Sequence, residues 1–327
     1  MTEDEHGYVK NAQRVGEGWA VEVVAKGYFY GPLDLAIGGN DEPVIVYHDH
    51  QETRFRPTLG DAALAVRAGP RWRLKTLEDG GHDGWDTRIY IDPAGMIHVS
   101  AVDPKEFDGA GVEYYRYGLD GEVSVEQIGS GPLTHKYATS VATDSAGTPY
   151  VTYYDQTTFD LILASRGASG WVRETVDADG DTGLFSDMLI DGDDRIHVSY
   201  FRRESDKSGT IKYATRAEGE PDWTFSDVAM IDTLEFGFVG ARNITSLALD
   251  GEGNSWIAIP DQSRVVLAIL AGGDWQLETV DEAGDLPLGQ LVSLALDRAG
   301  RPHIAYFEVT QSGPLKGVVK YALGEPK

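Results

Sequence analysis

The chain has 327 residues, with 28 basic and 53 acidic side chains and a formal net charge of −25. A surface this acidic repels nucleic acids and anionic lipids, which proteins bind through Lys and Arg, so neither nucleic acid nor membrane is an expected partner. The chain contains no Cys, which excludes disulfides, thiolate nucleophiles and Cys-ligated metals. Its first six residues lack the cationic and apolar stretches of a secretory signal, so we expect a cytoplasmic protein.

A repeat of about 50 residues runs through the chain, and its clearest copy is the segment 293–308, SLALDRAGRPHIAYFE. Each copy contains an apolar strand, a tight Asp-x-x-Gly turn, an alternating strand, a third strand and a fourth strand that often opens with Trp, as at Trp171. The six copies begin at Asp34, Arg88, Ser140, Asp187, Ser246 and Ser293. This order of elements is typical of four-stranded propeller blades.

The repeat resembles bacterial β-propeller units of the form S-L-A-L-D-x-x-G-x-P-H-I-x-Y-Y. The resemblance covers nearly the whole chain beyond about residue 15. It implies a fold and no particular function, because propellers host lectins, hydrolases, lyases, oxidases and scaffolds.

The two ends of the chain carry complementary parts of one blade. The last copy stops after its third strand, whereas residues 19–24, WAVEVV, have the pattern of a fourth strand. We therefore expect an all-β, six-bladed β-propeller in which this N-terminal strand closes the last blade. Residues 1–17 would be a tail and residues 18–327 a single domain, which we expect to be monomeric.

The connections of the repeat fall into two classes. Those joining strands one to two and three to four are short and alike, and lie on one face of a propeller. The others are long and differ from blade to blade, as in residues 47–57, 77–85, 132–137 and 234–242. Divergent loops on a rigid scaffold favour one binding or catalytic site on their face.

The histidines divide along the same lines. His98, His197 and His303 share one column of the second strand, which indicates a packing role. Four others, His48, His50, His82 and His135, fall on the divergent face of blades one to three. Because His48 and His50 form an H-x-H pair, these four predict a site for one divalent transition metal; the alternative is a set of solvated loop histidines.

Charged side chains interrupt two further columns. Asp34, Arg88 and Asp187 replace the usual Ser at the start of the innermost strand, where they would touch a ligand, unless Asp34 and Arg88 simply form an ion pair. Arg202 replaces an acidic residue at the end of the second strand and could hold an anion. The acidic members of that second column are Asp49, Asp103, Asp155, Asp261 and Glu308.

Two aromatic residues of the divergent loops, Trp85 and Phe236, are further candidates for substrate contact; Phe236 would otherwise belong to a protein-binding patch. The segment Asp177–Asp181 is rich in acid but lacks the spacing of a calcium loop. The chain has no G-x-S-x-G, phosphate-loop or dinucleotide motif, so no nucleotide cofactor is expected.

These observations favour an enzyme with one pocket that acts on a small polar or anionic molecule, by hydrolysis or elimination. His48, His50 and His135 would be metal ligands or bases, Tyr137 a proton donor, and Arg88 or Arg202 the holder of an anionic group. A lectin-like propeller that binds sugar and a protein-interaction scaffold are the alternatives.

Overall fold

The computed structural model describes residues 7–16, 18–27, 33–49, 60–78, 84–103, 111–118, 120–130, 139–205, 208–232, 244–261, 264–282, 288–312 and 315–325. Their regular secondary structure consists of β-strands, and none of these ranges contains a helix. A membrane-spanning helix is accordingly absent from the described residues. The chain divides into two compact units, residues 1–136 and 137–327.

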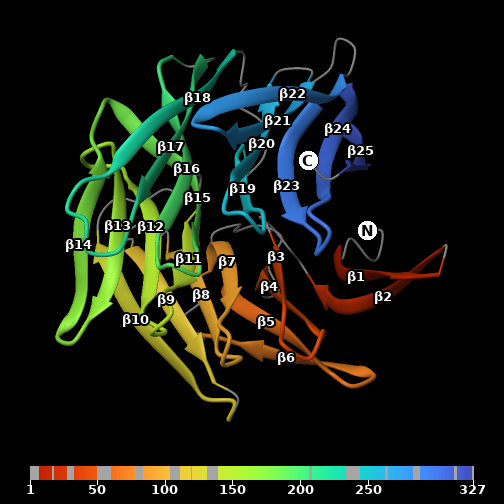
Figure 1. Cartoon of the computed structure of the whole chain (residues 1–327). Helices are drawn as coiled ribbons and strands as arrows, with labels where there is room; N and C mark the ends of the chain where they lie inside the picture. The colour runs from red at the N-terminus through yellow and green to blue at the C-terminus, as the bar shows by residue number, and fades with distance from the viewer. Residues whose placement is uncertain are drawn as a thin grey trace. The chain divides into compact units, whose positions relative to one another are not determined.

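The first unit holds a two-stranded hairpin and two four-stranded antiparallel sheets (Figure 1). The hairpin pairs β1 with β2, the first sheet has the order β3-β4-β5-β6, and the second has the order β7-β8-β9-β10. The strands are β1 (Gly7–Val15), β2 (Gly18–Gly27), β3 (Asp34–Ile37), β4 (Pro43–Asp49), β5 (Asp61–Ala68), β6 (Arg71–Thr76), β7 (Trp85–Ile91), β8 (Ile97–Asp103), β9 (Gly111–Tyr117) and β10 (Val123–Ser130).

The second unit continues the same meander through the third, fourth, fifth and sixth sheets. The third and fourth sheets contain β11 (Ser140–Thr143), β12 (Pro149–Asp155), β13 (Asp160–Gly167), β14 (Gly170–Asp177), β15 (Asp181–Ile190), β16 (Ile196–Arg203), β17 (Ser208–Arg216) and β18 (Thr224–Asp232). The fifth and sixth contain β19 (Ser246–Leu249), β20 (Ser255–Asp261), β21 (Arg264–Ala271), β22 (Asp274–Glu282), β23 (Leu288–Leu296), β24 (Pro302–Ser312) and β25 (Leu315–Leu323).

Six successive sheets of this order confirm the predicted fold class, an all-β, six-bladed β-propeller. The first strand of each copy pairs with the second in the same register, as in the pairing of Ser246 with Ala258 and of Ser293 with Ala305. Each sheet has a loop end, where its first strand begins and its second ends, and a turn end, where the Asp-x-x-Gly turns lie.

The tight turns keep their geometry even where the final Gly is missing. In the regular turn after β7, the Gly95 N–H donates to the carbonyl of Asp92 over 2.9 Å. Asp194 donates to Asp191 in the same way over 3.1 Å, with a φ of 58°. Because Asp tolerates the left-handed region better than most residues, the turn type is unchanged.

Apolar side chains of neighbouring sheets form the core within each unit. In the first unit, Val46 and Leu64 of the first sheet pack with Val99 and Tyr115 of the second. In the second unit, clusters of the same kind link the third sheet to the fourth, the fourth to the fifth and the fifth to the sixth. The alternating strands of the repeat therefore bury their apolar residues between sheets.

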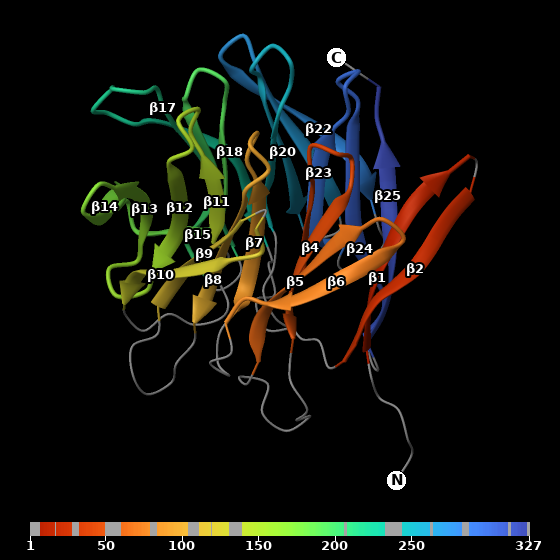
Figure 2. The same cartoon turned by 90° about the horizontal axis from the view of Figure 1, so that it is seen from below.

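The N-terminal segment differs from the prediction of a tail. Residues 19–24 lie in β2, which pairs along its length with β1, and Figure 2 shows the two strands as a long hairpin. A tight connection at Gly16, with a φ of 61°, makes this local pairing available. Within the described residues the sixth sheet has three strands, β23 to β25, and its closure by residues 19–24 stays a prediction.

The hairpin packs on the first sheet. Val9 and Val24 are buried against a cluster that includes Ile45 and Tyr47 of β4. These contacts cover an apolar face that the first sheet would otherwise present to water.

Candidate functional site

The residues that open the innermost strands are bonded to the neighbouring sheet. Asp34 Oδ2 accepts the backbone N–H of Ile89 over 3.0 Å, just as Ser140 Oγ accepts that of Met188 over 3.0 Å. In the fourth and fifth sheets Asp187 Oδ2 accepts the Leu247 N–H over 2.8 Å and Ser246 Oγ accepts the Leu294 N–H over 3.0 Å. Ser and Asp are thus interchangeable acceptors in this column, and contact of Asp34 or Asp187 with a ligand stays a prediction.

Arg88 is the basic member of this column. A guanidinium has five N–H donors and no acceptor atom, so it cannot accept a backbone N–H as Ser and Asp do. Its side chain is half-buried in β7. Arg88 therefore occupies a column position that holds an acceptor side chain in other sheets, and it carries a positive charge.

A buried carboxyl group lies two residues before Arg88. Asp86 is 1% exposed, and burial raises its pKa to about 7, against the opposing effect of the positive charge of Arg88. The corresponding positions of the fourth and fifth sheets carry Phe185 and Ile244, both buried in apolar clusters. Asp86 is therefore a buried acid at a position where the fourth and fifth sheets place a core residue, and its pKa is shifted toward neutral pH.

We did not predict Asp86 from the sequence. The second copy of the repeat begins at Arg88, and Asp86 precedes it in a segment whose sequence is typical of a connection. The available signal is the comparison of Asp86 with Phe185 and Ile244, which becomes visible once the copies are extended two residues toward the N-terminus.

The structure places His48 inside β4 rather than in the loop that follows. The side chain is 2% exposed, and its ring centroid lies 4.9 Å from that of Trp85. A Cβ at Gly60 would overlap the His48 ring, as a Cβ at Gly209 would overlap the ring of Phe201. His48 thus fills a position that another sheet gives to Phe, with Trp85 as its neighbour.

Five other predicted site residues lie outside the described ranges, namely His50, His82, His135, Tyr137 and Phe236. The described residues hold no group of three or more His, Cys, Asp or Glu side chains that could bind a metal ion. A metal bound through the four histidines stays a prediction.

The periodic histidines have the packing role predicted for them. His197 Nδ1 lies 2.5 Å from the Tyr213 hydroxyl, and its Nε2 lies 3.1 Å from Asp191 Oδ2 in the tight turn. The same arrangement joins His98 to Tyr114 and Asp92 in the second sheet, and His303 to Tyr321 and Asp297 in the sixth. Burial lowers the pKa of His197, so the ring is neutral at pH 7. Each imidazole ties the second strand to its turn and to the third strand.

Arg202, the predicted anion holder of the fourth sheet, is paired with carboxylates. Its guanidinium donates to Asp179 over 2.7 Å and to Glu204 over 3.0 Å. Next to it, Arg203 donates to Asp181, whose other oxygen accepts the Tyr154 hydroxyl over 2.7 Å. Any anion bound at Arg202 would have to compete with these carboxylates.

The acidic segment that begins at Asp177 joins two sheets. Asp177 Oδ2 accepts from the Tyr200 hydroxyl and from Lys212 Nζ, both over 2.6 Å, and these three side chains are buried. Asp281, Tyr306 and Lys320 repeat the arrangement between the fifth and sixth sheets, with both distances 2.7 Å. A contact that recurs between sheets is a structural one, so this segment is not a calcium loop.

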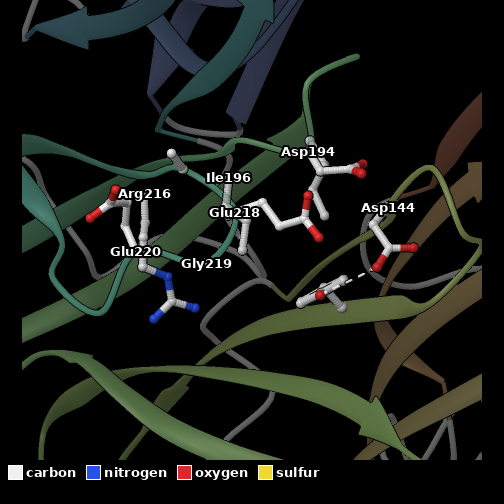
Figure 3. Close-up of a pocket in the computed structure, with 10 residues that line it drawn as sticks. Asp144, Asp194, Ile196, Arg216, Glu218, Gly219 and Glu220 are labelled. Atoms are coloured by element: carbon white, nitrogen blue, oxygen red, sulfur yellow. Dashed lines mark hydrogen bonds between the residues drawn. The ribbon is translucent and has the colours of Figure 1, made fainter.

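A pocket of about 310 Å³ lies at the turn end of the second unit, between the third and fourth sheets (Figure 3). Its walls include Asp144 and Tyr150 from the third sheet, and Asp194, Arg216 and Glu218 from the fourth. Residues 217–220 of the long connection between β17 and β18 form one side, and Figure 2 shows this β17–β18 hairpin projecting from its sheet. The prediction that all connections at this end are short is therefore wrong for the fourth sheet.

The charged groups of this pocket are held by neighbours. Arg216 makes two hydrogen bonds to Glu174, of 2.5 and 3.0 Å, and its guanidinium lies 4.5 Å from the ring centroid of Trp223. Asp194 accepts from the backbone N–H and the hydroxyl of Ser145, both over 2.6 Å. The pocket combines fixed carboxylates, a guanidinium and a Tyr ring.

No protein-family model matches the chain, and no curated protein matches its sequence. Among solved structures, the chain is similar to an α-L-arabinofuranosidase from Fusarium graminearum in complex with an iminosugar inhibitor (TM-score 0.59, 12% identity, 91% of this chain and 92% of that one). It is also similar to an ulvan lyase bound to -[GlcA(1-4)Rha3S]- (TM-score 0.56, 10% identity, 90% and 79%) and to the Aleuria aurantia lectin (TM-score 0.55, 11% identity, 85% and 89%). At these identities the likeness establishes the propeller fold.

Proposed function

We propose that this propeller is a carbohydrate-cleaving enzyme, a hydrolase or a lyase, in which Asp86 transfers the proton. The observation that carries the proposal is a buried carboxyl group, with a pKa of about 7, at a position that other sheets fill with an apolar side chain. The structural neighbours support the class of substrate, because they include a glycosidase, a polysaccharide lyase and a sugar-binding lectin.

The chemistry of a glycosidic bond fits an acid of this kind. Hydrolysis breaks the bond between the bridging oxygen and the anomeric carbon, and elimination breaks the bond between that oxygen and the other sugar ring. In both reactions the bridging oxygen takes a proton from an acid of the enzyme. An ordinary Asp is ionised at pH 7 and has no proton to give, whereas burial raises the pKa of Asp86 to about 7 and so favours the protonated form that an acid needs. In a hydrolase, water then adds to the anomeric carbon and gives its extra proton to a base. In a lyase, a base takes the C–H proton next to the breaking C–O bond, and the electron pair left behind forms a C=C bond.

The test compares two buried carboxyl groups. Asp86→Asn keeps the size of the side chain and removes the transferable proton, so we expect activity to fall by about 10² to 10⁴-fold. Asp177→Asn is the matched control, because Asp177 is buried between two sheets and bonded to Lys212 and Tyr200. Its cost should appear in thermal stability, with activity per folded molecule unchanged.

Reducing-end release detects hydrolysis, and ultraviolet absorbance of an unsaturated product detects elimination. Both should be measured on a panel of neutral and acidic polysaccharides. If Asp86→Asn cleaves as fast as the wild type, Asp86 is not the proton donor.

Sugar binding without cleavage is a second candidate function, and the pocket at the turn end favours it. A guanidinium, carboxylates and an aromatic ring are the groups that orient a sugar through hydrogen bonds and stacking. Calorimetric titration with monosaccharides should then show one site, since the long β17–β18 connection occurs in the fourth sheet. Arg216→Ala should abolish this binding and Asp86→Asn should preserve it.

The metal site predicted from the histidines is tested separately. His48→Phe introduces the residue that the fourth sheet has at the same position, Phe201, so the variant should fold. If the histidines bind a metal, the wild type as purified should contain about one equivalent of a divalent transition metal and His48→Phe should contain less. Equal metal contents of the two proteins would remove His48 from the site.

A further inference from the structure

We infer that the saccharide bound beside Asp86 carries an anionic group, a carboxylate or a sulfate, and that Arg88 binds it. The inference deepens the proposed function and rests on it for the location of the site. Its own basis is the position of Arg88 in the repeat.

The first step concerns what the column requires. Four members of the column, each in a different sheet, accept a backbone N–H from the next sheet. The donor is always the residue immediately after that sheet's own member of the column. Two of the four are Ser and two are Asp, so acceptor ability is the shared property. Arg has no acceptor atom, so Arg88 departs from the property that these members share.

The second step concerns the charge. The chain has a net charge of −25, and an anionic ligand would be repelled from most of its surface. A guanidinium presents two parallel N–H groups, which match the two oxygens of a carboxylate or of a sulfate. Arg88 thus supplies the local cation that an anionic saccharide would need on this protein.

The third step concerns location. Arg88 is half-buried, so its side chain is sheltered without being sealed from solvent. It lies close enough to Asp86 for its charge to favour the ionised form of that carboxyl. An anion on Arg88 would therefore be bound next to the proton-transferring group, and this placement links recognition of the substrate to its cleavage.

The decisive variant is Arg88→Ser, because Ser is the residue that β11 and β19 carry in this column. It introduces a residue that the column carries in other sheets, so the variant should fold. Arg73→Ser is the matched control, since Arg73 is an exposed residue of β6 in the same unit. Circular dichroism and thermal melting would establish that both variants are folded.

Binding is measured by calorimetry on Asp86→Asn, so that no turnover interferes, with and without Arg88→Ser or Arg73→Ser. The probes are oligogalacturonate for the carboxylate, a sulfated galactan oligosaccharide for the sulfate, and arabino-oligosaccharide as the neutral sugar. We expect one of the two anionic probes to bind, and Arg88→Ser to weaken that binding by about 10 to 100-fold, with no effect of Arg73→Ser.

The outcomes separate this inference from the proposed function. If the neutral probe binds and Arg88→Ser leaves its affinity unchanged, while neither anionic probe binds, the anionic inference is wrong and the carbohydrate site stands. If an anionic probe binds through Arg88 but Asp86→Asn does not slow any cleavage, the inference stands and the role of Asp86 is wrong. If no probe binds, the inference is overturned.

Discussion

Strands β7 and β15 have the same backbone conformation around Asp86 and Phe185 but carry different side chains there. Asp86 has a φ of 51° and Phe185 a φ of 57°, and both follow a glycine two residues earlier, Gly84 with a φ of 89° and Gly183 with a φ of 100°. The strand register shifts at the same place in both, between Trp85 and Arg88 and between Leu184 and Asp187. The left-handed backbone at Asp86 is thus a property of the architecture, and only the chemistry of the side chains distinguishes the two strands.

The comparison shows which observation bears on function. An unusual φ is often interpreted as strain stored for catalysis, but here Phe185 has the same φ in an apolar cluster. What changes between the strands is the replacement of Phe by Asp and of an acceptor Asp by Arg. The candidate site is defined by these two replacements.

We expect the largest effect on stability from introducing into β15 the carboxyl group that β7 carries at the same position. Phe185→Asp puts a carboxyl group into a cluster where Phe185 is 2% exposed, and it also removes the packing of an aromatic ring. We expect a loss of about 4 kcal/mol or more in the free energy of unfolding, measured with a chemical denaturant. A loss below about 1 kcal/mol would mean that this position tolerates an acid in any sheet, and that Asp86 is unremarkable for the repeat.

The next effect is a dependence of stability on pH. Asp86 binds its proton more tightly in the folded chain, with a pKa of about 7, than in the unfolded chain, with an ordinary value of 3.8. The proton on Asp86 therefore stabilises the folded state in acid, and this stabilisation is lost as the pH rises from about 4 to about 7, by on the order of 4 kcal/mol. Denaturant titrations across this range should show a difference of this size between the wild type and Asp86→Asn, whose side chain does not titrate.

The shared backbone is tested by alanine at the two glycines. A Cβ at Gly84 would overlap the backbone of Ala62, and one at Gly183 would overlap Leu161. Because both glycines also have positive φ, each substitution should destabilise the chain by about 2 to 3 kcal/mol. Thermal unfolding should give similar losses for the two variants. A large loss at Gly84 alone would show that β7 requires its backbone for more than architecture.

The smallest effect concerns the acceptor column. Asp187→Ala leaves the Leu247 N–H without its carboxylate acceptor and should cost about 1 to 2 kcal/mol, whereas Asp187→Ser should recover most of the loss. The free energies of unfolding of the two variants provide the measurement. Equal losses would mean that the charge of Asp187, rather than its acceptor atoms, stabilises the contact.

The sequence predicted the elements that repeat and missed those that depart from the repeat. The turns, the strand order and the packing role of His197 follow from periodic patterns, since each position is seen several times. His48 was misplaced in a loop, although its equivalents in other sheets, such as Tyr154 and Phe201, are buried residues of a strand. An H-x-H pair suggests a metal, but the column in which the first His stands indicates the core.

Asp86 and strand β1 lie outside the segments in which the periodic pattern is seen. A shift in register interrupts the alternation of β7 between Trp85 and Arg88, so a pattern of period two does not extend back to Asp86. Strand β1 has no counterpart in the repeat, and its polar residues, including Lys10 and Gln13, give a weak strand signal. Strand β1 depends on its pairing with β2, which a repeat alignment does not contain, whereas Asp86 stands out only when the copies are extended two residues toward the N-terminus.

The hairpin of β1 and β2 also has a consequence for the order of synthesis. Among the described residues, the apolar cluster that contains Val9 and Val24 extends along the chain as far as Trp72. Once roughly the first quarter of the chain has left the ribosome, both segments that form this apolar contact are therefore free to pack together. We expect this segment to collapse early, as a nucleus of short-range contacts onto which later strands are added.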